Sequence, residues 1–516
     1  MAVLPAQPHL DHLRRQARDL LRAARAGDAA ATARVLAVSD RLTLGAAQLA
    51  VARDYGFTSW AKLKVEVQAR AHDMARLAEQ FCQASIGDWT GRAARMLAAR
   101  PELADYNFAT AVVLGDARKV RNAIGADPAV ATRPDPRTGW TALHAACGSR
   151  WHRLDPARSE GLLAVAALLL DAGAAPNGRA AGHVAQWTPL RCAVAGAANP
   201  AITRLLLDRG AVPADHDIYL AGFADDDHQC LRMLLDDAGD VRAIARMALS
   251  APISGNDIEG VRLLLDAGAD PGRYLADSDQ PCPVIYAAVR SNCAAEIVDL
   301  LLAHGAEPAA PGPDGRSPHA LAASMGRTDL AALLRQHGAP DDATDLDVFL
   351  SACLRADRAG AERQVASRPR FLSQLTSEQR AAAMIRAAET GNTEAMRIML
   401  DMGFPADVHG GDHGSTALHA AAYSGSAGVA RLLIERGADV EARDHRWEST
   451  PLVWAAVGSG EKPADNPGPD WPATIGVLIE AGASLDGMTM SPDDPKPPSP
   501  AVAELLRHYG VPDEQR

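Results

Sequence analysis

Leucine triplets followed by a glycine recur along most of the chain. The phrase reads LLLDAGAAP at 168–176, LLLDRGAVP at 205–213, LLLDAGADP at 263–271 and LLLAHGAEP at 300–308, with later copies at 333–340, 432–440 and 477–485 and weaker ones ending at Gly239, Gly403 and Gly510. Clustered leucines give a helix an apolar ridge, and a glycine directly after them can end that helix in the left-handed conformation that a Cβ opposes. The pattern predicts a series of apolar helices, each closed by a glycine.

The spacing of these glycines gives the period of the series. From Gly173 to Gly338 there are 165 residues in five steps, or 33 residues per step. A second phrase precedes most of the glycines, and its copies read TALHAAC at 141–147, TPLRCAV at 188–194, SPHALAA at 317–323, TALHAAA at 416–422 and TPLVWAA at 450–456. The threonine or serine can cap a helix N-terminus, proline fits the first turn, and the alanines keep the helix thin. The two phrases therefore predict that each repeat consists of a thin helix followed by a leucine-rich helix.

The 33-residue period, the TALHAA phrase and the LLLDAGADP phrase together resemble the ankyrin-repeat family, whose unit is a β-turn and two antiparallel helices. The resemblance covers residues 79–512 and implies an all-α repeat fold, an ankyrin solenoid of about twelve helix-turn-helix repeats with short β-hairpin connectors. Four segments keep the helix pair but lack the TPLH phrase, so we expect them to be hairpin-less; these are 79–103, 107–130, 346–372 and 379–404. Three polar insertions, at 149–161, 178–186 and 458–472, are predicted to be surface loops.

Residues 1–72 differ from the repeats. Their leucine pattern predicts a helix over 9–26, and a second helix follows before a Tyr-Gly-Phe turn and a helix capped by Ser59. This part looks like the small N-terminal helical region that accompanies some bacterial ankyrin-repeat proteins. We therefore expect an N-terminal helical region over 1–72, a first ankyrin array over 73–342, and a part over 343–516 in which hairpin-less linking repeats precede further ankyrin repeats and a C-terminal cap.

The charge and the composition narrow the classes of partner. A net charge of −12 disfavours non-specific binding to nucleic acid and docking on an anionic membrane. The longest apolar run, 162–170, is about half the length of a membrane span, and no signal peptide is visible at the N-terminus, so we expect a cytoplasmic location. The seven cysteines include no CxxC pair, which argues against a zinc knuckle and a disulfide framework.

The sequence contains no motif that predicts catalysis, because both the P-loop pattern and the GxSxG pattern are absent. His144 and His419 stand in the fourth position of TALH, where the resemblance implies a hydrogen bond to the backbone of the neighbouring hairpin. His409, Asp412 and His413 could hold a metal only if further ligands converged on them, and a hairpin tip favours solvated charges instead. We therefore expect no catalytic residue, no metal and no cofactor.

In the ankyrin family, partners bind on a concave face built from hairpin tips and first helices, and the residue before the TPLH threonine points toward that face. Tryptophan and arginine at such positions are typical of interface hot spots. The predicted partner-binding residues are Trp140, Trp187, Arg290, Arg316, Ser415, Tyr423 and Trp447. We hypothesise that Trp140 and Trp187 form an aromatic patch. Packing against a neighbouring hairpin is the alternative for both, and it is the favoured interpretation for Trp447, whereas Trp454 is expected in the core.

These patterns favour a non-enzymatic protein–protein interaction module, a scaffold, adaptor or regulatory subunit that binds a protein partner on its concave face. Two alternatives stay open. One is a secreted effector that uses the same fold on host proteins. The other is an enzyme whose site lies in residues 1–72 or in an insertion loop, and a buried cleft with convergent polar groups would support it.

Overall fold

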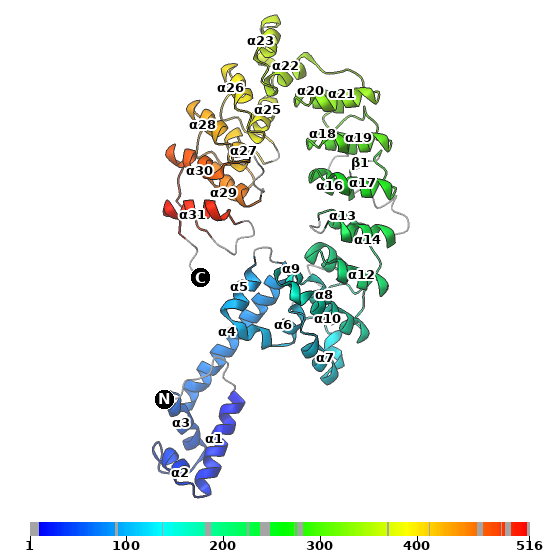
Figure 1. Cartoon of the computed structure of the whole chain (residues 1–516). Coiled ribbons are helices and arrows are strands. Elements are labelled where there is room, and N and C mark those ends of the chain that lie inside the picture. The colour runs from blue at the N-terminus through cyan, green and yellow to red at the C-terminus, as the bar shows by residue number, and fades with distance from the viewer. Residues whose placement is uncertain are drawn as a thin grey trace.

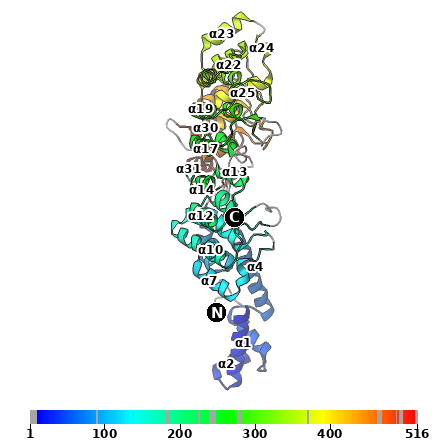
Figure 2. The ribbon, with the colours of Figure 1, turned by 90° about the vertical axis from the view of Figure 1, so that its right-hand side faces the viewer.

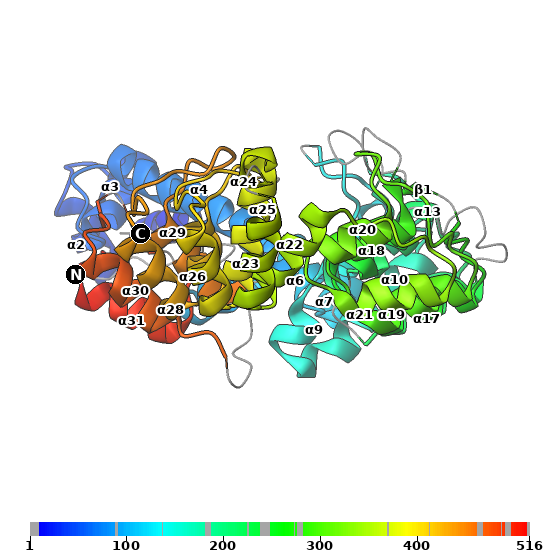
Figure 3. The same ribbon diagram turned by 90° about the horizontal axis from the view of Figure 1, so that it is seen from above.

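The structure is a computed structural model. It describes residues 10–87, 91–136, 138–180, 187–223, 227–237, 248–272, 274–275, 282–368, 371–411, 413–461, 468–486, 488–490 and 497–512. Almost all regular structure in these ranges is helical, and the helices stack in two limbs that meet at one end of the molecule (Figure 1). Seen edge-on the molecule is narrow (Figure 2), and from above the two limbs lie apart (Figure 3). The prediction of an all-α repeat fold is confirmed.

The N-terminal region is a small helical bundle with its own core. It consists of α1 (Leu10–Arg25), α2 (Ala29–Leu36), α3 (Leu44–Asp54) and the first part of α4 (Trp60–Gly87). The core draws on every helix of the bundle, and Leu13, Val35, Val51 and Leu63 are buried in it. The sequence pattern did not predict α2, whose N-terminus is capped by Asp28. Helix α4 continues without a break from the bundle into the first repeats, so one helix belongs to both.

The first limb runs from α5 to α21. Its helices are α5 (Arg92–Ala99), α6 (Phe108–Val113), α7 (Ala117–Ala126), α8 (Ala142–Gly148), α9 (Trp151–Leu154), α10 (Ser159–Asp171), α11 (Pro189–Arg191), α12 (Pro200–Asp208), α13 (Asp215–Ala221), α14 (Gln229–Asp237), α16 (Ser250–Ser254), α17 (Ile258–Asp266), α18 (Val284–Arg290), α19 (Ala295–Ala303), α20 (Pro318–Ser324) and α21 (Thr328–Gln336). Short 3₁₀ turns are η1 (Pro101–Asp105), η2 (Pro128–Ala131) and η3 (Pro156–Arg158), and η5 (Cys192–Ala197) is a π-helix.

The second limb runs from α22 to α31. Its helices are α22 (Asp345–Leu354), α23 (Arg358–Ser367), α24 (Phe371–Gln374), α25 (Ser377–Glu389), α26 (Thr393–Asp401), α27 (Ala417–Tyr423), α28 (Ala427–Glu435), α29 (Pro451–Glu461), α30 (Trp471–Glu480) and α31 (Pro500–His508). The first helix of each repeat faces the space between the limbs, and we call these the inner helices; the second helices lie outside and are called outer (Figure 1). Inner helix α20 packs on α22, and α22 packs on α25, so the stack passes from one limb to the other.

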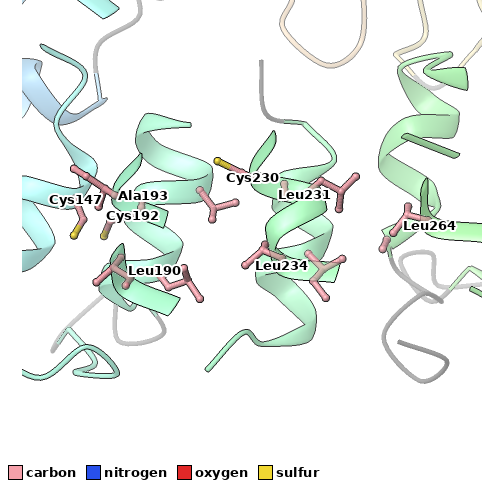
Figure 4. Close-up of a cluster of buried hydrophobic side chains, with 14 of the residues drawn as sticks. Cys147, Leu190, Cys192, Ala193, Cys230, Leu231, Leu234 and Leu264 are labelled. Atoms are coloured by element: carbon pink, nitrogen blue, oxygen red, sulfur yellow. The ribbon is translucent and has the colours of Figure 1, made fainter. Parts of the chain in front are cut away.

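Two apolar cores fill the limbs. One extends from Met74 to Ala339 and the other from Phe349 to Val511. The leucine triplets supply much of both cores, and Figure 4 shows Leu190, Leu234 and Leu264 among the side chains between successive helices of the first limb. Each repeat buries its leucine ridge against the next repeat, because a single helix pair cannot shield it.

The glycines that close the leucine-rich helices adopt the expected left-handed conformation. Gly173, Gly268 and Gly338 have φ values of 92°, 98° and 95°. Gly239 lies outside the described residues. Within the described ranges, regular β pairing in the connectors is limited to β1 (Tyr274–Leu275) with β2 (Cys282–Pro283) and to a single bridge between Gly410 and Ser415. Several other connectors are turns closed by backbone hydrogen bonds, so the predicted hairpins are mostly shorter than expected.

The insertion over 149–161 is not the surface loop that its composition predicted. It folds into α9 and η3, and Trp151 within it is only 3% exposed. The indole Nε1 of Trp151 donates to the hydroxyl of Ser85 on α4 at 2.9 Å, and its ring packs on that of Phe81. The insertion therefore connects α4 to the first limb. The burial of Trp151 places this segment inside the structure, although most of the residues around Trp151 are polar.

Candidate functional site

The histidine of the TALH phrase holds the next connector in place. In the first limb, Nδ1 of His144 accepts from the backbone N–H of Thr141 at 3.3 Å and lies 2.9 Å from its hydroxyl. On the other side of the ring, Nε2 lies 3.1 Å from the carbonyl oxygen of Gly178 and 3.2 Å from that of Trp187. Carbonyl oxygens can only accept, so Nε2 carries the proton and the ring is neutral. The expected hydrogen bond to the neighbouring hairpin is confirmed.

The two tryptophans that precede the TPLH threonines lie against each other. The ring centroids of Trp140 and Trp187 are 6.1 Å apart, and both side chains are half-buried. Each ring lies over a glycine near the end of an inner helix. A Cβ on Gly148 would meet Cζ3 of Trp140 at 3.6 Å, and one on Gly196 would meet Cζ3 of Trp187 at 3.9 Å. The glycines leave room for both indoles beside the inner helices.

A groove of about 1150 Å³ lies between α4, α6 and the connector that follows η2, and Trp140 is one of the residues that line it. Apolar side chains such as Ile86, Phe108 and Val112 line much of it. Hereafter this is the α4 groove. Sequence reasoning missed it, because α4 and α6 belong to repeats without the TPLH phrase, and because the groove exists only where α4 crosses the first inner helices. The aromatic residues Tyr106 and Phe108 were the available signal.

Cys82 also lines the α4 groove. Burial raises the pKa of its thiol to about 12, so the sulfur is protonated at neutral pH and is a poor nucleophile. Burial also raises the pKa of Cys147 and of Cys192 deeper in the limb. All seven cysteines are free thiols.

The other predicted partner-binding residues in the first limb differ in their availability. Arg290 is exposed at the end of inner helix α18. Arg316 is half-buried, and its guanidinium binds Asp347 and the carbonyl oxygen of Ala320 within the protein. Asp347 also accepts from the backbone N–H and the hydroxyl of Thr344, which caps α22. Arg316 thus links the two limbs through a carboxylate that the next repeat uses as a cap.

The remaining predicted residues lie in the second limb and form part of an aromatic cluster. Ser415 is buried, and its backbone pairs with Gly410. Trp447 is 54% exposed, but its ring packs on Trp454 with centroids 5.8 Å apart. The Trp454 ring also lies 5.9 Å from that of Tyr423, whose hydroxyl donates to Glu461 at 2.7 Å. These residues come together in one place, as a set of edge-to-face contacts.

Trp454 does not lie in the core, contrary to the sequence-based expectation. Its side chain is half-buried, and its Nε1 donates to Asp444 at 3.0 Å. The same carboxylate accepts from the backbone N–H groups of Arg446, Trp447 and Ser449. Asp444 therefore orders the connector that carries Trp447, and the hydrogen bonds lower its pKa although burial opposes this.

The outer helices present a different surface, because many of their charges are paired with charges of a neighbouring repeat. Arg209 binds Asp171 at 2.8 Å, and Arg262 binds Glu296 at 2.8 Å. In the second limb Arg436 binds Asp401, which also holds Arg358. Hydrogen bonds to these two arginines lower the pKa of Asp401. Ion pairs between neighbouring repeats thus recur along the outer face.

Within the described ranges, the structure brings together no group of three or more His, Cys, Asp or Glu side chains that could hold a metal ion. Asp412 lies outside these ranges, and His409 stacks on His445 with ring centroids 5.0 Å apart. In the described part of the chain, no helix is long and apolar enough to cross a membrane.

Known protein families and solved structures include some that are similar to this chain. A family profile described as "Ankyrin repeats (3 copies)" matches residues 247–345 and 361–444, and one described as "Ankyrin repeat" matches residues 138–180. Among solved structures, the human ASB11 ankyrin repeat domain is similar at 17% sequence identity and a TM-score of 0.22, over 46% of this chain and 98% of that one. The search of curated proteins gives no match. The profile matches fall in both limbs, and the chain is an ankyrin-repeat protein.

Proposed function

We propose that this protein is a non-enzymatic interaction module, a scaffold, adaptor or regulatory subunit, that binds a protein partner along its inner helices. Ankyrin repeats are protein–protein interaction modules in general, and the partner and the face are our inference. The observation that carries it is the half-buried Trp140–Trp187 pair, in which Trp140 also lines the apolar α4 groove. Rigid aromatic groups beside an apolar hollow gain much free energy when a partner removes them from water.

The charges favour the inner face over the outer face as the binding surface. On the outer helices, arginines such as Arg209 and Arg262 are paired with carboxylates of the neighbouring repeat. A partner there would have to displace these ion pairs, whereas the α4 groove offers apolar area whose burial is favourable by itself. Arg290 and Trp447 extend the proposed surface along the inner face of both limbs. The contacts that Arg316, Ser415 and Tyr423 make within the protein hold this surface in place.

We also propose three functional parts, the N-terminal region 1–72, the first array 73–342 and the second part 343–516. The large apolar cores support this division, because each part has one of its own among the described residues. Seven free cysteines, most of them buried, support a reducing compartment such as the cytoplasm, where thiols stay reduced.

The test is affinity capture with the intact chain followed by titration of the purified captured partner. The double variant Trp140→Ala/Trp187→Ala should weaken binding by about tenfold or more, because it removes the aromatic pair. Ala109→Arg, at an exposed position of the groove, should weaken binding by blocking it. Tyr509→Ala, a change at an exposed aromatic residue near the C-terminus, is the matched control. Equal affinity of the double variant and the unaltered chain would remove the proposal, provided that both melt at the same temperature.

A further inference from the structure

A second, polar cleft of about 390 Å³ lies where the two limbs meet, between outer helix α21 and helix α23. Three arginines line it, Arg335 from α21, Arg355 directly after α22 and Arg363 from α23. All three side chains belong to exposed residues. Figure 1 shows these helices at the turn between the limbs, at the end of the molecule away from the N-terminal bundle.

Two of these three arginines have side chains without a partner in the part of the protein that the structure describes. Arg335 binds Asp341 at 3.1 Å. Among the described residues, the side chains of Arg355 and Arg363 make neither a hydrogen bond nor an ion pair. Asp357 is the carboxylate among the lining residues, and it already accepts from the backbone N–H of Gly360 at 2.9 Å, where it caps α23. The cleft is therefore locally positive in a chain whose net charge is −12.

This arrangement departs from the pattern of the other outer helices. At several other outer helices an arginine meets a carboxylate of a neighbouring repeat, as Arg232 meets Glu259 at 2.7 Å and Arg436 meets Asp401 at 2.8 Å. Between α21 and α23 the corresponding space is a hollow lined by small side chains such as Ala331 and Ala352. The cleft volume lies near the lower end of the range of about 300–1,000 Å³ that ligand pockets occupy.

We propose that this cleft binds the phosphate group of a phosphorylated serine or threonine side chain on a partner polypeptide. A guanidinium can hold two phosphate oxygens at once through parallel N–H donors, and clusters of arginines are a common means of recognising such groups. Arg355 and Arg363 supply the charge, Thr328 supplies a hydroxyl at the start of α21, and Gln364 supplies an amide. The site lies apart from the α4 groove and does not depend on the function proposed there.

The experiment is a fluorescence anisotropy titration of the full chain with a fluorescein-labelled peptide, Gly-Ala-Ala-Ser-Ala-Ala-Gly, with and without phosphate on the serine. The phosphopeptide should bind at least about tenfold more tightly than its unphosphorylated twin, inorganic phosphate should compete with it, and binding should weaken as salt is raised. The double variant Arg355→Gln/Arg363→Gln should lose at least about tenfold in affinity for the phosphopeptide.

The matched control is Arg204→Gln/Arg431→Gln, which removes two exposed arginines of other outer helices and changes the net charge by the same amount. It should bind the phosphopeptide like the unaltered chain. Ala332→Glu, which places a carboxylate at an exposed position of the cleft, should reduce binding without removing either arginine. Equal binding of the two peptides, an equal loss in the control, or binding of inorganic phosphate without binding of the phosphopeptide would each overturn the proposal.

Discussion

The Nε2 atom of His144 lies 3.2 Å from the carbonyl oxygen of Trp187 and donates its hydrogen bond to it. The histidine thereby fixes the backbone of the residue whose side chain stands beside Trp140. His419 repeats this geometry in the second limb, where its Nε2 donates to the carbonyl oxygen of Ser449 at 3.0 Å. In both rings Nδ1 faces a donor, so both must stay neutral, and burial lowers the pKa of both.

These two histidines predict a loss of stability on acidification. In the unfolded chain a histidine has a pKa of about 6.5, and folding lowers it here, so the unfolded state binds more protons at acid pH. The stabilising contribution is therefore complete above about pH 6.5 and is lost as the pH falls below it. We expect the melting temperature to fall between about pH 7.5 and pH 5.5, and to fall less for His144→Gln/His419→Gln. The exposed His508→Gln should keep the slope of the unaltered chain; equal slopes for all three would contradict the prediction.

A buried ion pair joins two neighbouring repeats of the first limb. Arg191 stands where TALH has its histidine, and its Nε donates to Asp217 at 2.9 Å, with the two side chains 10% and 2% exposed. Asp217 also accepts from the backbone N–H of Ala214 at 2.9 Å, at the start of α13. Arg191→Met would leave this carboxylate buried without its charge partner, and we expect a loss of about 3–5 kcal/mol in the free energy of unfolding, measured by urea denaturation.

The exposed pair of Arg209 and Asp171 is the control for that measurement. Its side chains are 38% and 64% exposed, so solvent screens the attraction, and Arg209→Gln should cost less than about 1 kcal/mol. If Arg191→Met cost no more than Arg209→Gln, the link between the repeats would not depend on the buried charges.

The features that recur in the repeats could be predicted from the sequence, whereas the groove and the cleft, which each occur once, could not. The glycine after the leucine triplets, the capping hydroxyls of Thr188 and Ser317 and the contact of His144 with the next connector are local to one or two repeats, so one phrase predicts each of them. The α4 groove and the Arg355–Arg363 cleft arise where the stack begins and where it turns. Neither has a phrase of its own, because each also depends on how far apart two helices lie, and no single segment of the sequence determines that distance.

The burial of two tryptophans, Trp151 and Trp454, also could not be predicted from the segments that contain them. Trp151 lies in an insertion rich in polar residues, and only its contacts with Ser85 and Phe81 on α4 explain why it is buried. Trp454 lies in a phrase that normally belongs to the core, yet it turns toward Asp444. Composition describes a segment, whereas burial depends on the partner that the fold brings to it.

Leu264 tests the assignment of the leucine triplets to the core. Its side chain is fully buried between successive helices of the first limb (Figure 4). Leu264→Ala should lower the free energy of unfolding by about 2–5 kcal/mol, because the surrounding repeats can collapse only partly into the cavity. The exposed Leu36→Ala, in the N-terminal bundle, should change it by less than about 0.5 kcal/mol. An unaltered urea midpoint for Leu264→Ala would show that the core assignment is wrong.

Substitutions at two glycines in the last repeats can distinguish the effect of close helix packing from the effect of helix propensity. Gly458 lies in inner helix α29, where a Cβ would meet the carbonyl oxygen of Tyr423 on α27 at 2.2 Å, whereas a Cβ on Gly476 in outer helix α30 would meet no atom within 4 Å. Alanine favours a helix over glycine by about 0.5–1 kcal/mol at either position, so Gly476→Ala should raise the free energy of unfolding by that amount.

Gly458→Ala gains the same propensity but must push α29 away from α27, and overpacking of this kind costs about 1–3 kcal/mol. We therefore expect opposite shifts of the melting temperature for the two variants in the same limb, followed by circular dichroism. Because the contact is with a backbone carbonyl oxygen, no side-chain rotation can relieve it, and only a separation of the two inner helices can. A rise in melting temperature for Gly458→Ala would mean that α27 and α29 do not approach each other as closely as the structure has them.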